Sequence, residues 1–340
     1  MNFSVMKKSR TTPFSLIFGI AVLICMVIAT SIGVVSIPIE EVFKIIGQRI
    51  GLSSQTDIPA NHILTVWELR LPRIIMSLLA GASLAICGAV FQSIFRNPIC
   101  DPYMLGISSG ASLGAAIALI LGWDIFLFGI TTSALITALI TLFLIIIVSQ
   151  SGKRKSTEKL LLTGIALNFL ISAVITLLIV INQKEMSKII FWTMGSFASI
   201  TWKDIYFILP IMSITVFPLF YYAKELNIMQ MGSDTAKSLG VNTQKVSLTA
   251  LIFSSLLVAA VVSVCGVIGF IGLIIPHIVR FLFGNNNRKL FLYSLFFGAF
   301  FMLLADTFAR TLALPSELPV GSITAIAGAP YFIYLLLKTK

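Results

Sequence analysis

The stretch 71-LPRIIMSLLAGASLAICGAVFQSIF-95 decides the class of fold, because it contains a single charged side chain, Arg73, close to its start. An α-helix needs about 20 predominantly apolar residues to cross the hydrocarbon core of a bilayer. No water is available there to hydrogen-bond the backbone, so an apolar segment of this length has to be helical. The sequence therefore predicts a membrane-spanning helix over 71–95.

The rest of the chain has the same character. Of its 340 residues, 58% are hydrophobic and 11% are charged, whereas soluble domains carry roughly 25% charged residues. Further apolar runs, bounded by charged and turn residues, lie at 14–35, 103–121, 125–149, 160–181, 205–223, 246–266, 268–283, 290–310 and 320–337. We therefore predict an all-α polytopic membrane protein with about ten transmembrane helices, which form one transmembrane domain over 1–340. A soluble enzyme is excluded.

The charged residues predict the orientation of these spans. With the N-terminus in the cytoplasm, sixteen of the 24 Lys and Arg residues fall in inner segments and eight in outer ones, while four of the 13 acids fall inside. Cytoplasmic loops of membrane proteins carry an excess of Lys and Arg. This excess explains the net charge of +11 without a nucleic-acid partner. We expect a multi-pass protein of the plasma or inner membrane, with both termini in the cytoplasm.

Motifs for catalysis or metal binding are missing from the sequence. The four cysteines lack the paired spacings of zinc or redox sites. There is no G-x-x-x-x-G-K-[ST] phosphate loop, so any ATP used must be hydrolysed by a partner. Among the ionisable residues, only Asp306 and Arg310 form a pair within a span, one helical turn apart. Ion-coupled transporters usually need more such groups. These absences disfavour a membrane enzyme and a secondary transporter or channel, and we expect no bound cofactor or metal.

Glycines indicate close packing at two places. Gly106, Gly110 and Gly114 follow each other at four-residue spacing, which lets another helix approach closely. A second group lies within 266–272, where we expect irregular or tightly packed backbone.

The longest inner connection, 228-IMQMGSDTAKSLGVNTQKV-246, is a candidate docking segment. Ser233 or Asp234 is suited to cap a short helix, Gly240 to end it in a left-handed conformation, and Asn242 to cap the next helix. Two short helices separated by Gly240 would form a compact knob. The alternative, a helix lying on the lipid surface, is disfavoured by the weak amphipathic pattern.

Over nearly its whole length the sequence resembles the FecCD family, the permease subunits of binding-protein-dependent ABC importers for iron siderophores, heme and cobalamin. The motifs that carry the resemblance are 69-LRLPR-73, 81-GASLAICGAVFQSIFRNPICDPYMLGISSGASLG-114, 159-KLLLTGIALN-168, 191-FWTMGSF-197, 239-LGVN-242, 266-GVIGFIGLIIPHIVR-280, 305-ADTFAR-310 and 317-ELPVGSITAIAGAPYFIYLLLK-338.

The resemblance implies the type II ABC importer permease fold, with ten helices per subunit. It implies a second permease subunit, identical or a paralogue, with the pathway at the dimer interface. Two cytoplasmic ATPases that use the ATP and an extracytoplasmic substrate-binding protein complete the implied assembly. Ferric siderophores are the broadest substrate class of the family, so we rank them first, heme second and cobalamin third.

The resemblance also assigns roles to individual residues. Arg70, Arg73 and Arg310 match outer basic residues that pair with acids of the binding protein; their alternative role is anchoring at the membrane interface. Asn97 and Ile99 of the 96–100 loop match one part of the cytoplasmic gate. Thr157 and Glu158 match the other part, where Glu158 departs from the small or hydroxyl residues that are common in the family. The ATPase-coupling segment is matched by Ser233, Asp234, Leu239, Gly240, Val241 and Asn242.

Overall fold

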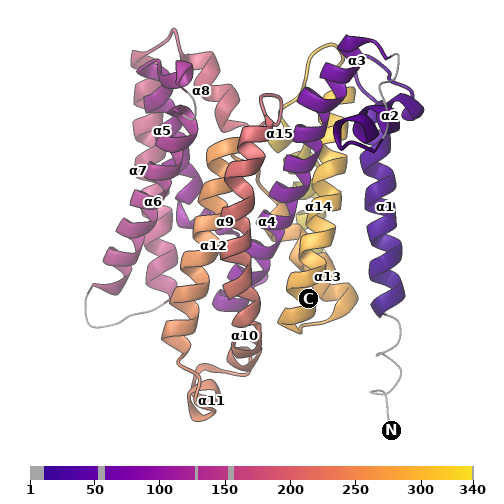
Figure 1. Ribbon diagram of the computed structural model, residues 1–340. Helices are drawn as coiled ribbons and strands as arrows, with labels where there is room; N and C mark the ends of the chain where they lie inside the picture. The colour runs from indigo at the N-terminus through magenta and orange to yellow at the C-terminus, as the bar shows by residue number, and fades with distance from the viewer. Residues whose placement is uncertain (1–10, 53–57, 127–128, 152–156, 339–340) are drawn as a thin grey trace.

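The computed structural model describes residues 11–52, 58–126, 129–151 and 157–338, which form helices joined by turns and loops. Figure 1 shows their arrangement. The elements are α1 (Thr11–Ser31), α2 (Ile39–Arg49), α3 (Ala60–Leu64), η1 (Thr65–Arg70), α4 (Leu71–Phe95), η2 (Pro102–Leu105), α5 (Ile107–Ile120), η3 (Trp123–Ile125), α6 (Gly129–Gln150), α7 (Thr157–Ile181), α8 (Met186–Thr193), α9 (Trp202–Tyr221), α10 (Ala223–Met229), α11 (Ser233–Ser238), α12 (Thr243–Cys265), α13 (Ile271–Phe283), α14 (Asn287–Thr311) and α15 (Val320–Lys338).

The prediction of about ten membrane helices is confirmed. Within the described ranges, six helices are long and apolar enough to cross a membrane, and four shorter apolar helices accompany them. These ten are α1, α4, α5, α6, α7, α9, α12, α13, α14 and α15, one for each predicted apolar run.

The second span differs from its prediction, because its helix starts before the apolar run. The helix is continuous from Ala60 to Phe95 and passes through the π-helical turn η1. Trp67 in this turn accepts a hydrogen bond on its carbonyl from the Trp202 indole at 2.9 Å. Val66 is fully buried in a small cluster with Ile37 and Val42. Packing of η1 against α2 and Trp202 therefore extends the helix through a stretch of mixed polar and apolar residues.

Helix α4 is the centre of the bundle, where α9, α12, α13 and α14 surround it (Figure 1). The contacts are close because glycines face each other. A Cβ on Gly81 would lie 2.2 Å from the carbonyl oxygen of Gly298 in α14. A Cβ on Gly88 would lie 1.9 Å from the carbonyl oxygen of Gly272 in α13. Small residues at such crossings let helices pack without a water-driven hydrophobic force.

The two predicted glycine features also pack closely. A Cβ on Gly110 or Gly114 would lie within 2.3 Å of a threonine hydroxyl on α6, so the α5 glycines seat that helix. The chain between α12 and α13 is non-helical, with Gly266 and Phe270 both at φ 71°. This break turns the chain inside the protein, where its polar backbone is covered.

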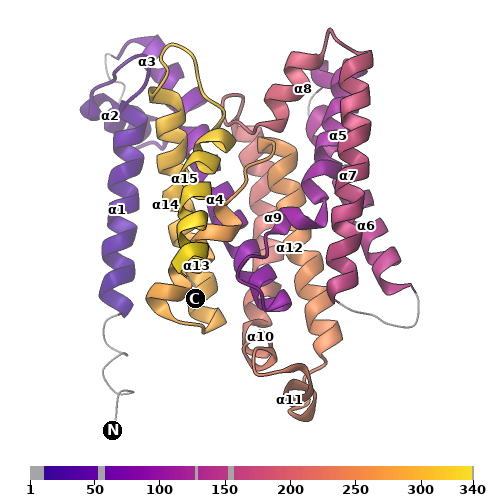
Figure 2. The same cartoon turned by 180° about the vertical axis from the view of Figure 1, so that it is seen from behind.

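The bundle has two distinct ends. Helices α2, α3 and α8 cover one end, while α10 and α11 project from the other (Figures 1 and 2). Helix α1 begins, and α15 ends, toward the end that carries α10 and α11 (Figure 2). We call these the α8 end and the α11 end. The charge pattern predicts that the α11 end faces the cytoplasm.

Candidate functional site

An ion-pair network lies at the α8 end, where α4, α14 and the α14–α15 connection meet. Arg73 Nε donates to Asp306 Oδ1 at 2.9 Å, and Arg73 NH2 lies 2.8 Å from the same oxygen. Arg73 NH1 donates to Glu317 Oε2 at 2.7 Å. Arg310 Nε lies 3.3 Å from Asp306 Oδ2, so the predicted pair one helical turn apart is present. The buried Asp306 carboxylate is therefore shared by two arginines.

Arg70 completes what we call the arginine cluster: Arg70, Arg73, Arg310, Asp306 and Glu317. Arg70 NH1 donates to the Thr30 carbonyl at 2.7 Å, and Arg70 NH2 donates to the Val35 carbonyl. A cation beside the last carbonyls of α1 satisfies backbone acceptors that the helix leaves unpaired. The cluster thus ties α1, α4 and α14 together.

The three arginines occupy a more enclosed place than the sequence suggests. Arg70, Arg73 and Arg310 are 7%, 7% and 5% exposed, because acids and carbonyls of the chain itself surround them. The Glu317 side chain is 39% exposed and forms the solvent-facing edge. Sequence analysis missed Glu317 as a partner of Arg73, since the two are 244 residues apart. The docking role of the arginines stays a prediction.

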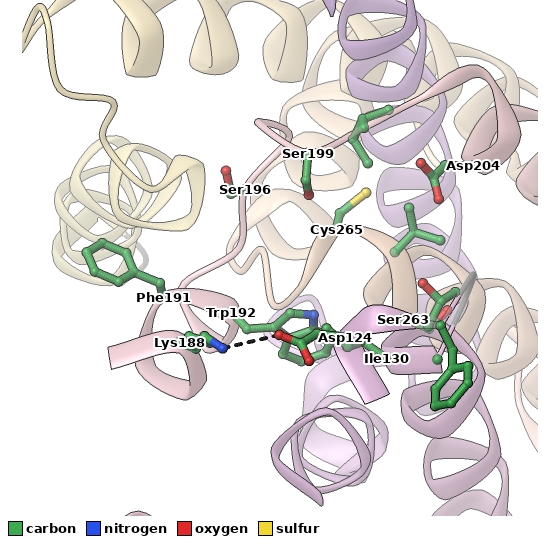
Figure 3. Close-up of a pocket in the computed structure, with 15 residues that line it drawn as sticks. Asp124, Ile130, Lys188, Phe191, Trp192, Ser196, Ser199, Asp204, Ser263 and Cys265 are labelled. Carbon is green, nitrogen blue, oxygen red and sulfur yellow. Dashed lines mark hydrogen bonds and ion pairs between the residues drawn. The ribbon is translucent and has the colours of Figure 1, made fainter. Parts of the chain in front are cut away.

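A pocket of about 380 Å³ opens beside α8 and is lined by α8, α9, α12 and the η3 region. Figure 3 shows Lys188 and Asp124 paired along one side, with Asp204, Ser199 and Cys265 opposite. Lys188 Nζ lies 3.2 Å from Asp124 and 3.0 Å from Glu185. The hydrogen bonds that Lys188 donates to Glu185 and Asp124 raise its pKa. Asp204 accepts from the Thr201 amide at 2.9 Å and caps α9. The charged walls of this outer pocket are already paired within the chain.

The predicted gate loop follows α4 at the α11 end. Arg96 ends α4 in a left-handed conformation, with φ 49°. Asn97 Oδ1 accepts from the Ile99 amide at 3.0 Å, and the Ile99 side chain is 41% exposed. Asp101 then caps η2 through the Tyr103 amide at 2.8 Å, and burial raises the pKa of its carboxyl to about 6. The loop is therefore short and internally bonded.

The second predicted gate stretch is only partly described. Thr157 and Glu158 are the first residues of α7, and their side chains lie outside the described part of the structure. Their gating role stays a prediction.

In the coupling segment, Gly240 and Asn242 have the expected conformations. Gly240 has φ +81°. Its amide donates to the Lys237 carbonyl at 2.9 Å, and the Val241 amide donates to the Ala236 carbonyl at 3.0 Å. This pair of bonds is a Schellman motif with glycine at its left-handed position. Asn242 Oδ1 accepts from the Lys245 amide at 3.0 Å.

Two expectations about this segment were wrong. Neither Ser233 nor Asp234 caps α11, because the helix begins directly after Gly232, at φ 125°, without a side-chain cap. Gly240 does not separate two short helices either. It separates α11 from the long α12, which extends the apolar run back to its Asn242 cap, while the short pair is α10 and α11, joined through Gly232.

The segment's surface is suited to a protein contact. Leu239 and Met231 are 61% and 70% exposed at the projecting tip, while Ala236 is fully buried beneath. The ATPase-coupling role of this segment stays a prediction.

Comparison with known proteins identifies this architecture. The model of the FecCD transport family matches residues 21–338. The chain belongs to the FecCD family. The permease YvrB of Bacillus subtilis is 39% identical over 93% of this chain and 90% of its own. The iron(3+)-hydroxamate import permease FhuG of the same organism is 35% identical over 98% and 100%. A solved inward-facing structure of a putative metal-chelate type ABC transporter covers 96% of this chain and 99% of its own, with a TM-score of 0.84 at 33% identity.

The chain is therefore the permease subunit of an ABC importer in the cell membrane, with the type II importer fold. Such subunits carry no ATPase site, and ATP is hydrolysed by a partner ATPase. Within the described ranges, no group of His, Cys, Asp and Glu side chains is placed to hold a metal ion.

Proposed function

We propose that this permease carries a ferric siderophore into the cytoplasm, paired with a second permease subunit, identical or a paralogue. The observation that carries the proposal is the full-length similarity to an iron(3+)-hydroxamate import permease, since hydroxamates are one chemical class of siderophore. The likeness to a metal-chelate type transporter over 96% of the chain supports the same class of cargo.

Other chelates and one oxyanion are the competing substrates. A cobalamin import permease of Halobacterium salinarum is 39% identical, a hemin permease of Yersinia pestis 36%, and a molybdate permease of Haemophilus influenzae 34%. These identities bracket that of the hydroxamate permease. The choice among substrates therefore has to be made by measurement.

Transport is proposed to proceed by alternating access between outward-open and inward-open states. The extracytoplasmic binding protein docks at the α8 end, where Arg70, Arg73 and Arg310 offer positive charge behind the Glu317 edge. Opposite charges on two proteins steer their encounter. At the α11 end, the 96–100 loop and the start of α7 close the pathway, and 228–246 seats in the ATPase. Both termini lie on this cytoplasmic side.

The test is reconstituted uptake. The permease, its ATPase and its binding protein are placed in liposomes, and entry of a ferric hydroxamate, hemin, cobalamin and molybdate is measured with ATP or with ADP. We expect ATP-dependent entry of the ferric hydroxamate. Selective entry of another substrate would replace the siderophore assignment, and uptake that ignores ATP and the ATPase would contradict the coupling mechanism.

A further inference from the structure

A second pocket, of about 220 Å³, lies at the α11 end between α4, α10 and α13. We call it the inner pocket; its lining residues are Gln92, Arg96, Pro98, Gln230 and Arg280. Two of these five side chains are guanidinium groups, and none is acidic. The pocket wall is therefore strongly positive.

The guanidinium groups of the inner pocket have no partner in the chain. Within the described residues, neither Arg96 nor Arg280 makes an ion pair or a side-chain hydrogen bond, and Arg280 Nε is buried without an acceptor. A buried donor without an acceptor is costly. By contrast, acids of the chain pair with Arg73 and Arg310 in the arginine cluster and with Lys188 in the outer pocket.

Gln92 adds a second unsatisfied group. It is 2% exposed, and its Nε2 donates to the Leu273 carbonyl at 3.0 Å. Its Oε1 is buried and accepts no hydrogen bond. The amide is held in place by its nitrogen, which leaves the oxygen as an acceptor. The inner pocket thus combines two cationic forks with one fixed acceptor.

We propose that the inner pocket binds a phosphate group that carries a neighbouring hydroxyl. Guanidinium forks match the oxygens of a phosphate, with charge-assisted hydrogen bonds. The hydroxyl donates to Gln92 Oε1. The phosphoglycerol headgroup of an anionic lipid has such a hydroxyl on its glycerol, and free hydrogen phosphate supplies one on the phosphorus itself.

The position of the inner pocket fits a lipid headgroup as the source. On the proposed orientation of the chain, the α11 end faces the cytoplasmic leaflet, whose surface is negative, and basic pockets between membrane helices on that side bind headgroups. A bound phosphate would touch Arg96 at the start of the gate loop and Gln230 directly after α10. It would join the gate loop to the helix that leads into the coupling segment.

Binding to the purified full-length permease in a neutral detergent tests the proposal without any transport assay. The probes are a short-chain phosphatidylglycerol, inorganic phosphate, and a short-chain phosphatidylcholine, which lacks both net charge and hydroxyl. We expect Arg280→Gln and Arg96→Gln to weaken phosphatidylglycerol binding at least tenfold, which corresponds to about 1.4 kcal/mol. Arg280→Lys retains the charge without the fork and should lose less.

Arg288→Gln is the matched control, because Arg288 is an exposed arginine in the first turn of α14; it should change binding less than twofold. Arg96 is itself exposed, so its variant should fold even if Arg280→Gln does not. Binding of phosphatidylglycerol alone would support the lipid as source, and binding of phosphate as well would support the free anion. Equal binding by wild type and both Gln variants would overturn the proposal. So would weakened capture of the ATPase without any effect on anion binding, which would assign the arginines to that subunit.

Discussion

At the scale of single residues, Glu317 is the member of the arginine cluster that solvent can reach. Because its carboxylate occupies Arg73 NH1 at 2.7 Å, an acid of the binding protein has to compete with it. We predict that Glu317→Gln strengthens docking of the binding protein, by up to about fivefold, since partly exposed ion pairs are worth ~0.2–1 kcal/mol. Docking affinity measured at low and high salt would check this, with the gain shrinking as salt rises.

The exposed acid Glu40, which pairs with Lys44 on the same helix, provides the control: Glu40→Gln should leave docking unchanged. Asp306→Asn has a different expected effect, because it leaves two buried arginines without their shared carboxylate. Breaking a buried pair costs about 3–5 kcal/mol, so this variant should lose thermal stability in detergent. Unaltered docking in Glu317→Gln would assign the arginine cluster to holding the helices together.

Gly240 is the residue on which the shape of the coupling segment depends. A Cβ there would meet no atom within 4 Å, so only its φ of +81° opposes a side chain. A β-branched residue in this conformation costs about 1–2 kcal/mol, which is enough to distort the exposed turn. We predict that Gly240→Val inserts normally and binds the loaded binding protein, but loses ATP-driven uptake and the stimulation of ATPase activity by that protein.

Gly240→Asn is the matched variant, because asparagine visits the left-handed region with a smaller penalty. It should retain most uptake. Wild-type uptake by Gly240→Val would mean that 228–246 is a passive loop.

At the scale of the elements, the crossing of α4 and α13 requires glycine. A methyl group on Gly88 would lie 1.9 Å from the backbone oxygen of Gly272, and backbone cannot yield as a flexible side chain does. Forcing such a contact costs about 1–3 kcal/mol. We predict that Gly88→Ala lowers the thermal unfolding midpoint in detergent. Gly269→Ala, at an open position near the start of α13, should leave it unchanged; an equal loss in both variants would contradict this account.

At the scale of the whole molecule, the prediction concerns which end faces the cytoplasm. Cysteine probes at Thr235 in α11 and at Gln183 after α7 lie at opposite ends of the bundle (Figure 2). In a background without Cys25, the one native cysteine that is not buried, an impermeant thiol reagent should label Gln183→Cys in intact spheroplasts. It should label Thr235→Cys only in inverted vesicles. The reverse pattern would overturn the orientation, and with it the placing of docking, gate and coupling surfaces.

The sequence alone determined the features that depend on neighbours along the chain. The apolar runs predicted one helix each, because a bilayer imposes length and hydrophobicity locally. The Asp306–Arg310 pair and the backbone of Gly240 and Asn242 were likewise predictable, since helix spacing and turn chemistry act over a few residues.

Only the tertiary structure decided which distant groups meet. Arg73 and Asp306 are 233 residues apart, and nothing in either motif shows that they share a buried ion pair. The same holds for Arg96 and Arg280, whose common pocket exists because α4 packs on α13 through Gly88 and Gly272. Charge partners and pockets depend on how helices cross in space, and that depends on long-range packing, which local patterns of hydrophobicity do not encode.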